Sequence, residues 1–362
     1  MIYKLYETRK INIDKELLHK IIEKFSEIKN KSGTFQVNNK QIKYNFLGKG
    51  GQGIVFSLEI DDNTIVAIKR CKSNKNENEN ALLKLMSGYV DSQIAPHFLL
   101  IYNILDIDDK DCIVMEKIDG DLNKWLEETH SDNEWMSFLF QILISVYVMK
   151  NYAKTFHNDL KPKNILFKNI NEKRAFLEYR LGNNTYFVPL FDKLFIVGDF
   201  GHSQSLLLDK NAMSNNQIKE KLDNNVDLYN IYTLIKRMKV DNIVKNFTIN
   251  ELIGIFEQNK INYLDYYNKE KRKIDNDLRI YNRKIKNDML LKSLAYYVIE
   301  NELYEQLTFK IPSKFKLPSK TIQDFIENKF DGKKNPEDII KEHYGRYMKD
   351  DKQNIVGTFN LA

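Results

Sequence analysis

The sequence predicts an α+β protein with two lobes, an N-terminal antiparallel sheet carrying one helix and a C-terminal lobe built of helices. From residue 41 the chain is made of short strand-like runs, and from residue 121 a helical period dominates. Its 362 residues, 42% of them hydrophobic, suffice for a large buried core. We therefore expect a strand-rich front half joined to a helix-rich back half.

The first 40 residues are predicted to form a helical extension. Between residues 14 and 30 apolar side chains recur at helical spacing, and the pattern breaks at Ser32 and Gly33. The apolar positions are Leu17, Leu18, Ile21, Ile22, Phe25 and Ile28.

Residues 41–118 are predicted to form the N-terminal lobe. One helix at about 79–88 interrupts the strands, and Asp61-Asp62-Asn63 is expected to make a tight turn. The strand-like runs cover residues 42–47, 54–60, 64–70, 99–105 and 112–118.

Residues 119–318 are predicted to form the C-terminal lobe, with helices over 134–154 and 226–238. Near 175–190, Gly182-Asn183-Asn184 separates two strand-like runs, which indicates an inserted hairpin. We interpret this hairpin as an added surface element. Residues 319–362, which follow Pro318, are predicted to be a helical tail.

Composition argues against several classes of protein. A net charge of +6 is mild for a chain of this length, so no nucleic-acid partner is expected. The basic run 269–286 is interpreted as a solvated helix face, and a docking surface is the alternative. The longest apolar stretch, 138–149, is too short to span a membrane. Two cysteines and the absence of a signal-like N-terminus favour the cytoplasm. We expect a monomer.

A glycine-rich segment follows the first strand of this lobe. Gly48, Gly50 and Gly53 form a GxGxxG pattern, with Val55 two positions further on. A dinucleotide-binding motif would need a helix directly after the last glycine, whereas residues 54–60 are strand-like. The pattern therefore favours a hairpin whose glycines let backbone amides lie over a triphosphate.

A lysine follows on the third strand, in the segment VAIK that ends at Lys69. An ammonium that binds a triphosphate needs a carboxylate to fix its position. Glu79 is the preferred partner over Glu77, because residues at i+3, i+4 and i+7 from Glu79 are apolar and place it beside the packed face of its helix.

The segment FHNDLKPKNILF, residues 156–167, has the polar spacing that phosphoryl transfer to a hydroxyl requires. Asp159 is a candidate base for the attacking hydroxyl. Lys161 is a candidate for neutralising charge on the moving phosphate, and Asn164 offers an amide oxygen to Mg²⁺. Asp199, in the segment DFG after another apolar strand, is the second candidate ligand for Mg²⁺.

Together these four segments resemble the protein kinase superfamily over roughly residues 42–240. The resemblance implies a two-lobed protein-kinase-like fold with ATP in the cleft, covered by the glycines and contacted by Val55 and Ala67. It also implies that Met115 is the gatekeeper and that Asp121 reaches the ribose. Glu116 and Ile118 would offer backbone groups to adenine, and Asp227 would brace the catalytic loop.

Two features depart from the family pattern. Asn158 stands where the family has an arginine, so no cation is ready to bind a phosphorylated activation loop, and we expect activity without such phosphorylation. No proline lies between Pro189 and Pro312, so the APE motif that ends the activation segment is missing. The compact spacing, the inserted hairpin and this missing motif are similar to the divergent kinases of large cytoplasmic DNA viruses, which implies host cytoplasm or virion as the location.

The function implied is transfer of the ATP γ-phosphate to Ser/Thr hydroxyls of a protein, because Lys161 matches the serine/threonine branch. A small-molecule kinase of the aminoglycoside or choline type is one alternative, although such enzymes usually lack a full glycine loop. A pseudokinase scaffold is another, and the presence of Lys69, Asp159, Asn164 and Asp199 argues against it.

Overall fold

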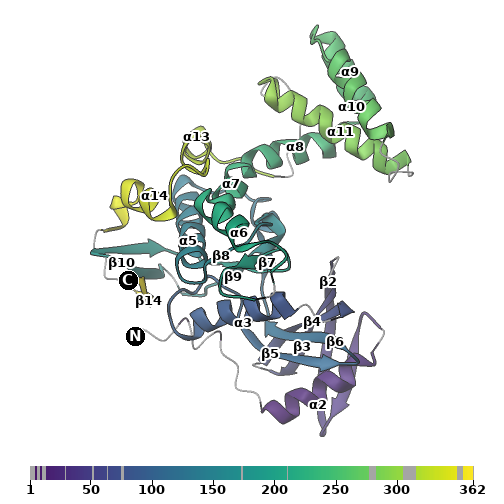
Figure 1. Ribbon diagram of the computed structural model, residues 1–362. Helices are drawn as coiled ribbons and strands as arrows, with labels where there is room; N and C mark the ends of the chain where they lie inside the picture. Colours follow the sequence, from purple (N-terminus) through teal and green to yellow (C-terminus); the bar gives the residue numbers. More distant parts are fainter. Residues whose placement is uncertain are drawn as a thin grey trace.

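The structure is a computed structural model, and it describes residues 5, 9, 14–28, 30–50, 53–62, 64–74, 77–172, 174–209, 211–276, 283–304, 315–348 and 354–361. An antiparallel sheet with helices forms one lobe, and a larger, mainly helical region forms the other (Figure 1). This arrangement confirms the predicted fold class. The two lobes are joined where β6 ends at Glu116.

The N-terminal lobe is a six-stranded sheet in the order β1-β2-β3-β4-β6-β5, with every neighbouring pair antiparallel. Five of the strands correspond to the predicted runs, with ends shifted by a few residues. β1 was not predicted, because its sequence SGTFQV is short and mostly polar. The strands are β1 (Ser32–Val37), β2 (Lys40–Lys49), β3 (Gly53–Asp61), β4 (Thr64–Asn74), β5 (Ile101–Ile107) and β6 (Lys110–Glu116).

The N-terminal helix α2 (Lys15–Ser26) covers one face of this sheet. Asp14 caps it by accepting a hydrogen bond from Leu17 N at 2.8 Å, and Phe25 packs edge to face on Phe56. The guanidinium of Arg70 on β4 donates to two carbonyls at the end of the helix. Residues 14–37 thus belong to the N-terminal lobe and include a strand, whereas the sequence indicated a helical extension only.

Helix α3 (Glu77–Asp91) packs beside the same sheet. Its buried face follows the predicted spacing and consists of Glu79, Leu82, Leu83, Met86, Ser87 and Val90. The turn between β3 and β4 includes Asp61 and Asp62, while Asn63 lies outside the described residues.

The C-terminal lobe is built around α5 (Asp132–Asn151), in which every residue from Trp135 to Met149 is buried. Ser131 and Glu134 form a capping box at its start. Around it lie β7 (Gly120–Asp121), α4 (Leu122–Trp125), β8 (Thr155–Phe156), β9 (Ile165–Asn169), β12 (Lys193–Val197), β13 (Gln204–Ser205), α6 (Asn215–Asp223), α7 (Val226–Tyr232) and α8 (Leu234–Asn246).

The predicted hairpin exists as β10 (Phe176–Leu181) and β11 (Asn184–Pro189), but it is part of the core. Tyr179 and Tyr186 are fully buried, and both rings contact Phe140 on α5. The chain end β14 (Ile355–Leu361) pairs with β10 in parallel and completes a three-stranded sheet. The interpretation of the hairpin as a surface element was therefore wrong, because its alternate side chains fill the space beside α5.

The tail after Pro318 contains two helices, α13 (Lys320–Lys329) and α14 (Pro336–His343), followed by the short turn η3 (Gly345–Met348). These helices pack on α5, with Tyr344 against Phe140. The tail ends in the strand β14 rather than in a helix, because its last residues alternate at a period of two and pair with β10.

Three helices form an arm that projects from the C-terminal lobe (Figure 1). The arm has its own apolar core and consists of α9 (Ile249–Gln258), α10 (Leu264–Asn276) and α11 (Arg283–Glu300). The predicted basic run lies on α10 and α11, and its middle, residues 277–282, is outside the described residues. Among the residues that the structure describes, no helix is long and apolar enough to span a membrane.

A buried histidine connects the two lobes. His97 Nδ1 donates to the Phe195 carbonyl at 2.8 Å, so Nε2 carries no proton and accepts from the Tyr179 hydroxyl. Burial is the main cause that lowers the pKa of His97 to about 3. The charge of Arg9 lowers this pKa further, and the hydrogen bond to Phe195 acts in the opposite direction. The side chain is therefore neutral at physiological pH.

We predict that the free energy of unfolding decreases as the pH falls from 6.5 towards 3. In this window the unfolded chain binds a proton at His97 and the folded chain does not, so the slope from this group is about 1.4 kcal/mol per pH unit. The measurement is urea unfolding of the wild type and of His97→Gln at several pH values. The variant should lack this part of the slope, and an equal slope in both proteins would contradict the assignment.

Candidate active site

A cavity of about 460 Å³ opens between the two lobes, and twelve of the predicted site residues line it. They come from the glycine hairpin, β4, α3, the end of β6, the predicted catalytic loop (residues 157–164) and the DFG segment (residues 199–201). The twelve are Gly50, Gly53, Val55, Ala67, Lys69, Glu79, Met115, Glu116, Ile118, Asp159, Lys161 and Asp199.

Six further residues, which the sequence analysis did not select, also line the cavity. Leu166 could have been found, because it lies two residues after Asn164 on β9, whereas the others gave no pattern of their own. The six are Leu47, Leu83, Leu99, Ile113, Leu166 and His202. The lining thus combines apolar side chains with a few lysines and carboxylates, as ligand pockets commonly do.

The two strands of the predicted glycine hairpin are present, as the antiparallel pair β2 and β3. Gly50 N donates to Gly53 O at 2.9 Å, and Lys72 Nζ donates to Gly50 O at 2.6 Å. A Cβ on Gly53 would stand 2.7 Å from the Arg70 carbonyl oxygen, so only glycine allows β3 and β4 to approach this closely. A Cβ on Gly48 or Gly50 would meet no protein atom within 4 Å. The connecting residues 51 and 52 are outside the described part.

Lys69 and Glu79 form the ion pair that the sequence predicted, with 2.7 Å between Nζ and Oε1. Burial opposes the charged form of Lys69, but Glu79, through its charge and its hydrogen bond, and Asp199, through its charge, outweigh it. The pKa of Lys69 is therefore raised above its ordinary value, and the lysine stays an ammonium. Glu79 is buried on α3, as its spacing indicated.

The catalytic loop is held from below by Asp227 on α7, as the resemblance implied. Its two carboxylate oxygens accept from His157 N at 2.8 Å and from Asn158 N at 3.0 Å. Burial raises the pKa of Asp227, and His157 and the two amides oppose this shift. Asn158 has a left-handed backbone, with φ of 63°, which asparagine tolerates better than most residues.

Two side chains position the carboxylate of Asp159. Lys161 Nζ donates to its Oδ2 at 2.5 Å. The amide of Asn164 donates to its backbone oxygen at 2.8 Å and to Oδ2 at 3.1 Å. The three polar residues of the predicted loop are therefore brought into direct contact.

His157 connects this loop to the DFG segment. Its Nε2 donates to Gly198 O at 2.9 Å, so its Nδ1 accepts from Asp159 N at 3.3 Å. Its ring contacts Phe200, which is fully buried. Asp199 has a left-handed backbone, with φ of 62°, and lines the cavity. The loop and the DFG segment are thus fixed relative to each other.

The donor set fits a cation that arrives with a phosphate better than a resident metal. The NH₂ group of Asn164 is used on Asp159, which leaves the amide oxygen as the atom able to bind a cation. Asp199 adds a carboxylate. Among the described residues no cluster of three or more His, Cys, Asp or Glu could hold a metal. A hard cation would need phosphate oxygens to complete its shell.

Asp121 occupies a different position from the rest of the set. Its carboxylate caps α4 by accepting from Lys124 N at 3.2 Å, and it does not line the cavity among the described residues. The predicted contact with a ribose therefore stays a prediction. Glu116 lines the cavity through its backbone only, because its side chain has no exposed surface.

The segment between the DFG motif and α6 is held by uncharged side chains. Asn78 on α3 donates to Ser203 O at 3.1 Å, and Ser203 Oγ donates to His157 O at 3.1 Å. The Asn211 amide donates to Ser205 O and Leu208 O at 2.7 and 2.6 Å. β13 in this segment pairs with β8. Among the described residues of this segment, these contacts with α3 and the catalytic loop are made by uncharged groups.

Comparison with known families matches residues 42–220 to the protein kinase domain. This region belongs to the protein kinase superfamily. The matched region contains the glycine hairpin, Lys69, Glu79, the catalytic loop and Asp199, so the similarity covers the cavity as a whole.

Several curated kinases are similar to part of this chain. A calmodulin-binding receptor-like cytoplasmic kinase 1 of Arabidopsis thaliana is 33% identical over 34% of this chain and 28% of its own length. "Probable serine/threonine-protein kinase 380R" of Invertebrate iridescent virus 6 is 28% identical over 48% of this chain and 34% of its own. Serine/threonine-protein kinase tousled-like 1 of Caenorhabditis elegans is 30% identical over 38% of this chain and 16% of its own length. The matches thus span about a third or less of these relatives, and one relative is viral.

We predict that Asp227→Asn loosens the catalytic loop. An asparagine would present an NH₂ group to one of the two backbone amides, so about 1.5–3 kcal/mol of charge-assisted hydrogen bonding is lost. Hydrogen exchange at the amides of His157 and Asn158 should accelerate by roughly tenfold or more. Asp223→Asn, at an exposed position on α6, is the control and should exchange as the wild type. Unchanged exchange in Asp227→Asn would contradict the bracing role.

Proposed function

We propose that this chain is an ATP- and Mg²⁺-dependent protein kinase that phosphorylates serine and threonine hydroxyls. The observation that carries the proposal is the joint placement of the Lys69–Glu79 pair and Asp159 in one cavity. A cation for the phosphates and a base for the hydroxyl are the two parts that phosphoryl transfer needs most.

Each residue of the site would have a role that follows from its position. Lys69, kept charged by Glu79, would bind the α- and β-phosphates of ATP under the glycine hairpin. Adenine would lie between Ala67, Ile118 and Leu166, against Met115. Asp159 would accept the proton of the attacking hydroxyl through Oδ1, since Lys161 and Asn164 both use Oδ2. Lys161 would then stand beside the transferring phosphate.

Asn164 and Asp199 would hold the Mg²⁺ ion that accompanies ATP. When bound, the ion would neutralise charge on the phosphates. The chain's own contribution is to keep both oxygens in place: Asn164 through its two bonds to Asp159, and Asp199 through the bond between His157 and Gly198.

A protein hydroxyl of serine or threonine is the proposed acceptor. Lys161 contacts the base directly, which is the position and residue type of the serine/threonine branch. Two of the similar kinases carry serine/threonine-protein kinase in their names. The full glycine hairpin supports this class over small-molecule kinases.

Activity without phosphorylation of the activation segment is also proposed. Three hydroxyl residues lie between Asp199 and Asp227, namely Ser203, Ser205 and Ser214. Ser203 and Ser205 are fully buried, and the Ser214 hydroxyl caps α6. The hydrogen bond from Asn78 joins α3 to this segment, and this contact would support the Lys69–Glu79 pair without an added phosphate.

We predict that Asp159→Asn reduces kcat by about two to four orders of magnitude, because general base catalysis accelerates reactions by about that factor. ATP affinity should change little, since the base acts on the hydroxyl in the transition state. The measurement pairs steady-state phosphorylation of a protein substrate with titration of ATP. Asp265→Asn, an exposed carboxylate on the arm, should behave as the wild type. Unchanged turnover in Asp159→Asn would refute the mechanism.

We also predict that protein stripped of phosphate by a phosphatase keeps its activity, and that Ser214→Ala keeps it too. The anchors of the activation segment are amides and hydroxyls that need no added charge. The measurement compares initial rates before and after treatment, with mass spectrometry to verify that the phosphate is gone. A treated protein that is inert and recovers only when a segment serine is phosphorylated would contradict this prediction.

A further inference from the structure

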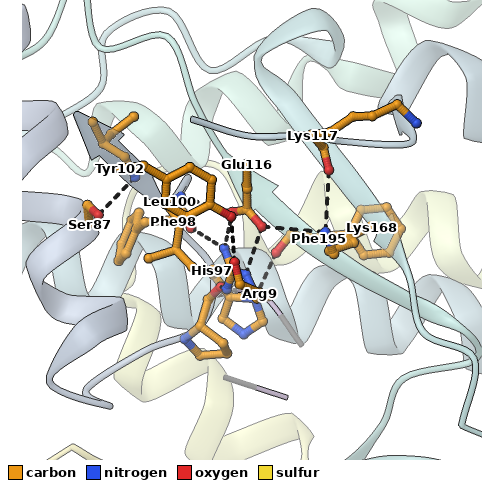
Figure 2. Close-up of polar contacts among 12 residues, drawn as sticks. Arg9, Ser87, His97, Phe98, Leu100, Tyr102, Glu116, Lys117, Lys168 and Phe195 are labelled. Atoms are coloured by element: carbon orange, nitrogen blue, oxygen red, sulfur yellow. Dashed lines mark hydrogen bonds and ion pairs between the residues drawn. The ribbon is translucent and has the colours of Figure 1, made fainter. Parts of the chain in front are cut away.

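A buried arginine from the N-terminal segment lies directly behind the nucleotide cavity. Arg9 is 2% exposed, and the side chain of its partner Glu116 has no exposed surface. Figure 2 shows the polar contacts that join the two side chains. Arg9 precedes the region matched to the kinase domain, which begins at residue 42. A fully buried arginine needs acceptors for its donors, so its contacts show what it holds in place.

The guanidinium joins two segments that are far apart in the sequence. Its Nε donates to Glu116 Oε2 at 3.0 Å, and Nη2 donates to the other carboxylate oxygen in a two-point contact. Nη2 also donates to Phe98 O at 2.6 Å, and Nη1 donates to Pro96 O. The loop between α3 and β5 is thereby tied to the last residue of β6.

Both of these segments supply the wall of the cavity. Leu99, which follows Phe98, lines it, and Glu116 lines it through its backbone. The network continues between the two segments, since Leu100 N donates to Glu116 Oε1 at 2.9 Å and Glu116 N donates to Leu100 O at 3.0 Å. A change in the carboxylate position would therefore move backbone that adenine is proposed to contact.

The surroundings of Arg9 fix its backbone as well. The Tyr102 hydroxyl donates to Arg9 O at 2.5 Å, and burial, with the charge of Glu116, raises the pKa of that hydroxyl, so it remains a donor. Leu5 is buried in the main core, and with Arg9 it borders β14 at Gly357 to Phe359. Residues 5 and 9 thus border β14 at the end of the chain, and Arg9 also binds Glu116 at the hinge, the segment 116–118 between the two lobes.

We propose that Arg9 is a positioning residue for the nucleotide site, which sets ATP affinity by holding the hinge from behind. This inference rests on the proposed function, because it assumes that the cavity binds ATP. Among the residues that the structure describes, the other cation in contact with this carboxylate is Lys168, whose Nζ lies 3.8 Å from Oε2. Without the guanidinium, the carboxylate would turn towards Lys168 and take the Glu116 backbone with it, while the catalytic loop would keep its own anchor on Asp227.

The test compares full-length wild type with Arg9→Met, which keeps the length of the side chain but removes the charge and the donors. ATP dissociation constants and kcat at saturating ATP are measured well below the unfolding temperature. We expect Arg9→Met to weaken ATP binding by roughly tenfold. We expect kcat at saturating ATP to stay within about threefold of the wild type, because Asp159 and its partners are not touched.

Arg70→Met is the matched control. Arg70 also donates to two backbone carbonyls, Ser26 O and Ile28 O, both at 2.8 Å, but it ties α2 to the sheet away from the cavity wall. Both variants should lower the unfolding temperature, and only Arg9→Met should change ATP affinity. Arg9→Lys keeps the charge next to Glu116 but cannot reach all the acceptors, so it should weaken ATP binding by about threefold.

The outcomes separate the two proposals. If the wild type does not bind ATP, the proposed function fails. If the wild type binds ATP and Arg9→Met binds it within twofold while its unfolding temperature falls as in Arg70→Met, Arg9 only stabilises the fold and the inference is overturned. Should Arg9→Met not fold, wild-type ATP affinity in a folded Arg9→Lys protein would overturn it equally.

Discussion

The ion pair between Lys69 and Glu79 joins a strand of the sheet to the helix beside it, at the wall of the cavity. Its ammonium and carboxylate are both largely buried, so each needs the other, and the pair forms only when β4 and α3 are correctly placed. Several distant contacts serve this placement. Asn78 on α3 holds the activation segment, and that segment holds the backbone of the catalytic loop through Ser203.

The residues that depart from the family pattern are compatible with an assembled site. Asn158 stands where the family has an arginine, and the segment after the DFG motif is held by Ser203, Ser205 and Asn211. Asn158 also suits the left-handed backbone that this point of the loop requires. Asn158 and this segment are far apart in the sequence but meet in space, because Ser203 Oγ donates to the carbonyl of His157, the residue before Asn158.

Much of the site could be predicted from the sequence, because its chemistry is concentrated in short segments. The spacing of Glu79 on its helix was enough to predict its ion pair with Lys69. Asp159, Lys161 and Asn164 were found in one short segment, and the structure shows that they are in direct contact. What could not be predicted depends on contacts across long separations. The strand β14 pairs with β10 about 180 residues away, and Arg9 meets Glu116 across 107 residues, with no local pattern to mark either. The hairpin at 176–189 was found, but its burial against α5 depends on those partners.

The central claim is that the assembled cavity transfers the γ-phosphate of ATP to serine or threonine in proteins. The most direct measurement supplies γ-labelled ATP and Mg²⁺ with a mixture of proteins, and in parallel with aminoglycosides, and then identifies the labelled amino acid. We expect the label on phosphoserine and phosphothreonine in the protein fraction. Label on the aminoglycosides alone, on tyrosine alone, or on no acceptor would contradict it.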